Sequence, residues 1–305
     1  MLEKYWLNQG KVVDTGEGPA PVWVYVDPNE AEKRQLVDEF GLDEHTLVSA
    51  LDPDELARLE WEQDHAVLIY KRPSSYQEEG RFMFRVASTG LFLFKERLVL
   101  VQAKEAPSFD GKLFSRVTSL RNLVLRLISR AVSHYLEHLR VINLATDELE
   151  AKVNASLENK YLIYMFILQK SLVYYLSSIS SNGGLIERLR NNAARLELGP
   201  DGPEWLDDLS IENTQCYKQA EIYSSILASL MDARASIVSN NLNVLMKTLN
   251  MLTIAIMVPT FVVSAFSMNV PVPLSGHSWA FWVILFMAAL STVGWLVFWK
   301  RWRWL

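Results

Sequence analysis

The chain has 305 residues, of which 50% are hydrophobic, and its mean hydropathy of +0.07 excludes a disordered or collagen-like protein. Its charge is uneven: no Asp or Glu follows Asp232, and the residues up to Asn241 carry a net charge of −9. Nucleic-acid binding needs clustered positive charge, so we expect no nucleic-acid partner.

The first 110 residues alternate short apolar runs with turns, which predicts a cytosolic α+β domain at 1–110. Strands are expected in the runs PVWVYVDP, HAVLIYKRP, RFMFRVASTGLFLF and RLVLVQA, and helices at 29–40 and 52–62. The chain start lacks the basic and apolar regions of a secretory signal, so this part is expected to stay inside the cell.

Residues 111–208 follow a helical pattern that predicts two long antiparallel helices, with breakers at Gly183-Gly184 and a loop at 199–208. The basic series in this region is expected to face solvent, because its spacing wanders around a helix; it comprises Arg116, Arg121, Arg126 and Arg130. His134 and His138 match the H-x-x-E-H pattern of a metalloprotease class, but no third ligand is identifiable. We therefore predict that the chain is not an enzyme.

The C-terminal part contains two apolar runs, at 249–266 and 278–299, that are long enough to cross about 30 Å of hydrocarbon. One helix at 209–266 is expected to form a stalk and the first span. The external loop at 267–277 has no Lys or Arg, whereas a basic tail follows at 300–305. By the positive-inside rule, we expect a multi-pass protein of the inner (plasma) membrane with both termini in the cytoplasm.

A stripe of polar and Met residues follows the predicted stalk and first span. Alternate steps of four and three residues from Asp232 select Ser236, Ser239, Asn243, Met246, Asn250, Thr253, Met257, Thr260 and Ser264. One interpretation is hydrogen bonding between neighbouring membrane helices. The other is a pore lining, which requires a symmetric ring of subunits because two spans cannot enclose a polar channel. Neutral oxygens suit a cation that keeps its water.

The segment SNNLNVLMKTLNMLTIAIMVPTF and the later SMNV, within 239–270, resemble the stalk-to-pore helix of the CorA family of divalent-cation channels. That family's hallmark is Gly-Met-Asn at the end of the first of two C-terminal spans. The runs PVWVYVDPNEAE, LDPDELARLE and RLVLVQA and the basic tail also stand where the family has equivalents. The resemblance therefore covers nearly the whole chain.

The resemblance implies a funnel-shaped homopentamer in the lipid bilayer, with an α+β cytosolic domain, long stalk helices around the pore and an outer ring of second spans. It implies uptake of Mg²⁺, with Co²⁺ and Ni²⁺ as further substrates. The motif Ser267, Met268 and Asn269 would select the ion, with Asn269 binding hydrated Mg²⁺. The implied path is lined by Asn243, Met246, Leu249, Asn250, Thr253, Met257 and Thr260. Asp232 and Asp208 match acids through which intracellular Mg²⁺ closes the channel, with Asp232 as a metal ligand.

Two departures from the family pattern leave other functions open. Ser267 replaces the motif glycine, and the loop has Pro271-Val-Pro273-Leu in place of an acidic Met-Pro-Glu-Leu stretch. A serine is disfavoured where a positive φ is needed. Zinc-transporting relatives of the ZntB type usually alter this motif, so proton-coupled Zn²⁺ transport is an alternative. A second alternative is a membrane sensor of metal ions that transports nothing.

Overall fold

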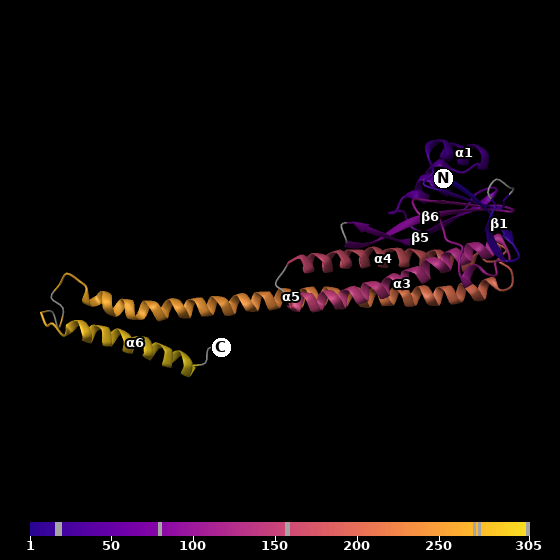
Figure 1. The fold of residues 1–305 in the computed structure, drawn as a ribbon. Helices are drawn as coiled ribbons and strands as arrows, with labels where there is room; N and C mark the ends of the chain where they lie inside the picture. The colour runs from indigo at the N-terminus through magenta and orange to yellow at the C-terminus, as the bar shows by residue number, and fades with distance from the viewer. Residues whose placement is uncertain (16–19, 79–80, 156–158, 271–272, 274–275, 303–305) are drawn as a thin grey trace. The chain divides into compact units, whose positions relative to one another are not determined.

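The computed structural model describes all residues except 16–19, 79–80, 156–158, 271–272, 274–275 and 303–305. The chain divides into two compact units, Met1–Met231 and Asp232–Leu305. Helix α5 (Gly202–Phe266) begins in the first unit and ends in the second (Figure 1).

The first unit is built on a seven-stranded sheet with the order β2-β1-β3-β7-β6-β5-β4, in which only the pair β3 and β7 is parallel. The strands are β1 (Leu2–Asn8), β2 (Lys11–Asp14), β3 (Val22–Val26), β4 (Arg58–Trp61), β5 (His65–Glu78), β6 (Arg81–Phe94) and β7 (Leu98–Gln102). The helices are α1 (Glu30–Phe40), α2 (Glu44–Leu51), a 3-10 turn η1 (Lys112–Phe114), α3 (Leu120–Ala155), α4 (Asn159–Asn191) and the first part of α5.

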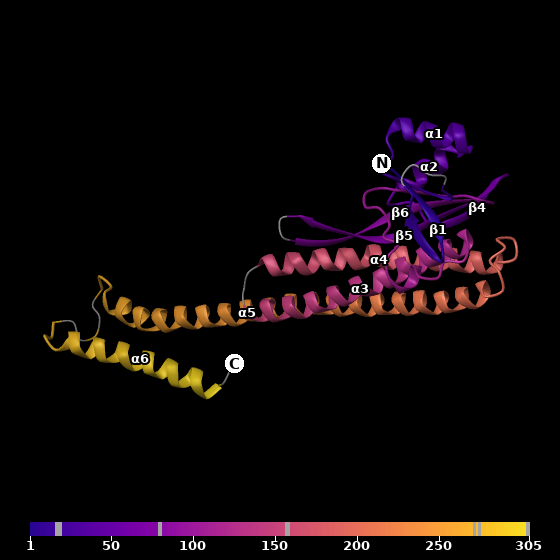
Figure 2. The same ribbon diagram turned by 45° about the vertical axis from the view of Figure 1, so that its right-hand side comes forward.

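Both faces of the sheet are covered, so its central strands are apolar on both sides. In β7, Leu98 and Leu100 belong to one core cluster, while Val99 and Val101 belong to the other. This division follows from the alternation of side chains along a strand. The first cluster packs against α3, α4 and the start of α5, and the second packs against α1 and α2. Figures 1 and 2 show the same α/β/α layering.

The short helices on the second face have well-defined ends. Asn29 caps α1: its side chain accepts from the Glu32 N–H at 2.9 Å, and the Glu32 carboxylate accepts from the Asn29 N–H at 2.9 Å. Gly41 ends the helix with φ 65°, a conformation that favours glycine. Asp43 then caps α2 by accepting from the Thr46 N–H at 2.8 Å.

The second unit contains the rest of α5 and helix α6 (Ala280–Trp302). Three helices of the described chain are long and apolar enough to cross a membrane: Lys160–Asn191, Gly202–Phe266 and Ala280–Arg301. The most apolar stretch is 39% buried in the first, but 0% and 6% buried in the other two. The first, in α4, owes its apolar character to packing, because Leu172, Tyr175 and Ile179 lie fully buried in the core.

The α/β domain and the long helices agree with the sequence predictions, but several boundaries were wrong. The predicted helix at 52–62 is a turn followed by strand β4, and α2 lies just before it. The predicted loop at 199–208 is helical from Gly202, so the stalk helix begins seven residues before position 209. The second apolar helix spans Ala280–Trp302 and not 278–299. Gly183 and Gly184 lie within α4 and do not interrupt it.

Candidate ion path and regulatory acids

The predicted pore stripe lies along one exposed face of α5. Asn243, Met246, Leu249, Asn250, Thr253, Met257 and Thr260 are all exposed in the single chain. At about 100° per residue, these positions gather on one side of the helix. The polar side chains of this face, Asn243, Asn250, Thr253 and Thr260, are therefore open to solvent or to a neighbouring molecule.

The opposite face of α5 is partly covered within the second unit. Half-buried side chains recur at helical spacing along it: Met251, Ala255, Val258, Val262 and Phe266. Helix α6, in the same unit, carries the buried Ala288, whose exposure is only 6%. These positions mark the face of α5 that packs within the chain, and they leave the polar stripe pointing away from it.

The threonine hydroxyls on this helix are already bonded to the backbone. Thr253 Oγ1 donates to the Leu249 carbonyl at 2.9 Å, and Thr260 Oγ1 donates to the Ile256 carbonyl at 2.7 Å. Because the single hydroxyl proton is used, only oxygen lone pairs face outward. Such a surface accepts hydrogen bonds from the water shell of a cation.

The predicted selectivity motif follows directly on the end of α5. Ser267 does not adopt a positive φ; its Oγ and its backbone N–H both donate to the Ser264 carbonyl, at 2.9 and 3.1 Å. The hydroxyl thus caps the last turn where a glycine has no side chain to do so. Met268 and Asn269 are exposed beyond it. Within the described chain the Asn269 amide has no hydrogen-bond partner.

The two predicted regulatory acids belong to different units. Asp232 is the first residue of the second unit and is exposed. Asp208 lies in α5 within the first unit and lines a cavity of about 420 Å³ with three further acids, Asp201, Glu204 and Glu212. In the part of the chain that the structure describes, no three His, Cys, Asp or Glu side chains form a metal-binding cluster. The single chain therefore supplies acids to this region without completing a metal site.

The H-x-x-E-H segment forms a packed cluster on α3. His138 Nδ1 lies 2.6 Å from the Tyr175 hydroxyl, and the His138 ring packs edge-on against Phe84. Burial lowers the pKa of His138 to about 4. Glu137 instead forms a 3.2 Å ion pair with Arg130 at the surface. Within the described chain, His138 therefore contributes to the packing of α3 against α4 and β6.

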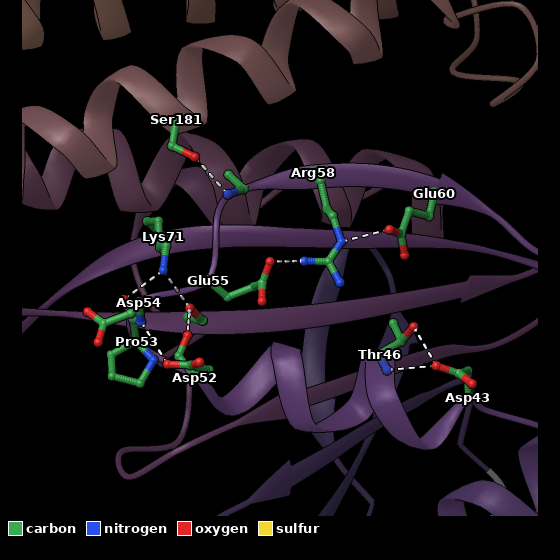
Figure 3. A network of polar contacts seen from close by, with 12 residues as sticks. Asp43, Thr46, Asp52, Pro53, Asp54, Glu55, Arg58, Glu60, Lys71 and Ser181 are labelled. Atoms are coloured by element: carbon green, nitrogen blue, oxygen red, sulfur yellow. Dashed lines mark hydrogen bonds and ion pairs between the residues drawn. The ribbon is translucent and has the colours of Figure 1, made fainter.

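The acidic LDPDELARLE segment surrounds a buried lysine (Figure 3). Lys71, on β5, is 3% exposed, and its Nζ donates to the Pro53 carbonyl at 2.7 Å and to Ser88 Oγ at 2.9 Å. Burial lowers the pKa of Lys71, while Asp52 and other nearby acids oppose that shift. The side chain of Asn182, on α4, bonds both backbone groups of Lys71 at 2.8 Å. The network fixes this turn to the sheet and α4.

The expectation of a solvated arginine face was wrong for Arg126. This residue is 8% exposed, and its guanidinium donates to the Arg116 carbonyl at 2.7 Å and to Asn122 Oδ1 at 2.6 Å. It also stacks on the Trp205 ring at 4.6 Å, which ties the start of α5 to α3. No sequence pattern indicates this role, because most of the partners are backbone carbonyls and a tryptophan distant in sequence.

A family model described as CorA-like Mg²⁺ transporter protein matches residues 20–301. The chain therefore belongs to the CorA-like family of divalent-cation transporters. It is 23% identical over 296 residues to the cobalt/magnesium transport protein CorA of Methanocaldococcus jannaschii, covering 93% of this chain and 91% of the relative.

Two solved structures share the fold. The complete CorA magnesium transporter from Methanocaldococcus jannaschii gives a TM-score of 0.82 at 20% identity, covering 100% of this chain and 98% of that one. The ZntB cytoplasmic domain from Vibrio parahaemolyticus gives 0.57 at 15% identity, covering 78% of this chain and 98% of that one. Because a magnesium transporter and a ZntB domain both share this fold, the fold alone does not identify the transported ion.

Proposed function

We propose that this protein is a CorA-type channel for Mg²⁺ uptake across the inner (plasma) membrane, with Co²⁺ and Ni²⁺ as further substrates. Family membership supports divalent-cation transport. The observation that carries the proposal is the face of α5 on which Asn, Thr and Met side chains recur; it lies opposite the face packed within the chain, and Ser267, Met268 and Asn269 follow the end of the helix.

The proposed assembly is a funnel-shaped homopentamer with both termini in the cytoplasm. Helix α5 of each subunit would turn its polar face to the central axis, and α6 would face lipid. A ring is needed because a single polar helix cannot enclose water. The cytosolic α/β units would form the wide end of the funnel.

The proposed path selects an ion without fully dehydrating it. Mg²⁺ gives up its water reluctantly, so a ring of Asn269 amide oxygens would hold the hydrated ion by its water shell. A second ring, formed by the Asn243 amides, would hold the hydrated ion in the same way at the cytosolic end. Met246 and Leu249 would form the apolar constriction between them, which closes by excluding water.

The proposed gate responds to intracellular Mg²⁺. The carboxylates of Asp232 would form a ring at the pore, and Asp208 would share a Mg²⁺ with an acid of the neighbouring subunit. The acidic cavity at Asp208 supports this assignment, because it gathers four carboxylate side chains, and carboxylate oxygens are ligands that Mg²⁺ prefers. Divalent cations bridging such acids would hold the subunits in the closed arrangement.

The test is cation flux into proteoliposomes of the full-length protein, comparing Mg²⁺, Co²⁺, Ni²⁺ and Zn²⁺ with and without a pH gradient. We expect Mg²⁺ entry driven by voltage alone, closure by Mg²⁺ loaded inside, and loss of selectivity in Asn269→Ala. Asp232→Ala should need more internal Mg²⁺ to close. Unchanged flux and selectivity in Asn269→Ala would rule out the selector.

A matched pair of threonines tests the pore face itself. Thr253 lies on the polar stripe and Thr248 about 140° round the helix, yet both hydroxyls donate to the carbonyl four residues earlier at 2.9 Å. Thr253→Val should reduce Mg²⁺ flux by about tenfold, because it removes an acceptor from the path. Thr248→Val should leave the flux unchanged. Equal effects in the two variants would place the path elsewhere.

The same experiment distinguishes the alternatives. Proton-coupled Zn²⁺ transport is favoured by one observation, the replacement of the motif glycine by Ser267. It predicts Zn²⁺ entry that requires the pH gradient. A sensor that transports nothing predicts no flux of any of the four ions.

A further inference from the structure

A cavity of about 170 Å³ lies in the first unit between α3, strands β5 and β7, and the loop after β7. It is distinct from the acidic cavity at Asp208, because the two share no lining residue. Besides Tyr70, its polar lining consists of Arg72, Gln102, Glu105, Ser108, Arg130 and His134. With two arginines and one carboxylate, the lining of the cavity carries a net positive charge.

The charge of Arg72 is not neutralised by a carboxylate. Its Nη2 donates to the Ala103 carbonyl at 3.1 Å, and its Nε is buried without a hydrogen-bond partner. Within the described residues it forms no ion pair. A guanidinium that is partly withdrawn from water and unpaired is unfavourable, and an anion in the cavity would relieve that cost.

The second arginine of the lining comes from a different element. Arg130, on α3, pairs with Glu137 at 3.2 Å, but both side chains are about half exposed. Such surface pairs are weak, so this guanidinium can serve another partner. Burial lowers the pKa of His134 most; Arg130 and Arg72 lower it further, whereas Glu137 and Glu105 oppose the shift. The two positive charges therefore act on the same point of the cavity wall.

The size of the cavity limits the ligand. Sites for drug-sized molecules occupy about 300–1,000 Å³, so about 170 Å³ suits a small ion. Guanidinium groups match the geometry of oxyanions, to which they donate paired hydrogen bonds. Gln102 adds an amide held in place on both sides: its Oε1 accepts from Thr89 Oγ1 at 3.4 Å and its Nε2 donates to the Glu105 carbonyl.

We propose that this cavity binds a small tetrahedral oxyanion of the phosphate or sulfate class between Arg72 and Arg130. Glu105 is the opposing charge on the wall, and its carboxylate weakens the site. The proposal is independent of the ion path, because every lining residue belongs to the first unit.

The test is calorimetric titration of the purified full-length protein with sodium phosphate, and separately with sodium sulfate, at pH 7 without divalent cations. We expect saturable binding of one anion per chain. Arg72→Gln and Arg130→Gln should each weaken it by at least about tenfold, the scale of one hydrogen bond to a charged group. Glu105→Gln should tighten it.

Arg140→Gln is the matched control, because Arg140 is an exposed arginine on the same helix outside the cavity. It should bind phosphate as the wild type does. Circular dichroism checks the fold of every variant, and Arg130→Gln carries the test if Arg72→Gln unfolds, because Arg130 is half exposed. Absence of saturable binding, or equal binding in all the arginine variants, would overturn the proposal.

Discussion

Two histidines on α3 are held neutral inside the first unit. Burial lowers the pKa of His138 to about 4, and burial together with Arg130 lowers that of His134. The His138 ring lies between Phe84 and Tyr175, where an added charge would lose its water. Protonation of these histidines therefore destabilises the folded packing of this region.

We predict that the first unit loses stability as the pH falls from about 6.5 toward 4. An unfolded histidine binds a proton below about 6.5, whereas folded His138 does so only near 4. In that interval the unfolded chain binds more protons than the folded chain, so the free energy of unfolding decreases as the pH decreases. Thermal unfolding followed by near-ultraviolet circular dichroism between pH 7 and 5 measures this.

His138→Gln should flatten the dependence, because the substituted side chain does not titrate. The exposed His45 gives the control, and His45→Gln should keep the wild-type slope. The same slope in wild type and His138→Gln would show that His138 does not cause the loss.

At the scale of elements, two adjacent glycines in α4 have different roles. A Cβ at Gly183 would lie 3.0 Å from Asn213 Nδ2, which is buried and donates to the Ile179 carbonyl at 3.1 Å. A Cβ at Gly184 would meet nothing within 4 Å. Gly183 therefore permits the close approach of α4 and α5, whereas Gly184 only weakens the helix.

Gly183→Ala and Gly184→Ala should accordingly change stability in opposite directions. We expect Gly183→Ala to lower the free energy of unfolding by about 1–3 kcal/mol through overpacking. Gly184→Ala should raise it by up to about 1 kcal/mol, the difference in helix propensity. Denaturant unfolding followed by circular dichroism measures both. Stabilisation by both substitutions would mean that Asn213 moves aside without loss.

Elements marked by apolar runs were predictable, whereas those defined by pairing or packing were not. Strands β3, β5, β6 and β7 follow runs of large apolar residues, as the sequence indicates. Strands β1 and β2, at one end of the sheet, were missed because their burial is partial and their residues are mixed. Residues 52–62 read as a helix, but Pro53 follows the end of α2, and Arg58–Trp61 pairs with β5.

The candidate site divides in the same way. The stripe on α5 was predictable because it depends only on helical periodicity within one element. The acids beside Asp208 are also local in sequence, because Glu204 and Glu212 lie four residues either side of it on α5. The cavity between Arg72 and Arg130 depends on tertiary packing, which brings together residues 58 positions apart. The start of α5 was misjudged because the Gly- and Pro-containing segment 199–208 predicts a loop, although proline is well tolerated in the first turn of a helix, where Pro203 lies.

At the scale of the whole molecule, the surface of the second unit argues for assembly. Large apolar side chains flank the polar stripe on α5 and are exposed in the single chain; they include Leu242, Leu245, Leu252, Ile256, Phe261 and Val263. Apolar side chains can face lipid. For the Asn250 amide and the Thr253 hydroxyl oxygen on the same helix, contact with lipid is unfavourable in free energy. An amide without a partner in hydrocarbon costs about 2–7 kcal/mol. A ring of subunits would remove that cost, because the stripe would then face a water-filled central pore.

We therefore predict that the full-length protein in detergent or nanodiscs is a single closed oligomer, and a pentamer if it assembles as the CorA resemblance implies. Native mass spectrometry should give about five times the chain mass of 34.9 kDa. Asp232→Ala should keep that mass, because its proposed role is gating and not assembly. Particles that conduct Mg²⁺ as monomers or dimers would contradict the ring, because one or two copies of α5 leave Asn250 facing lipid.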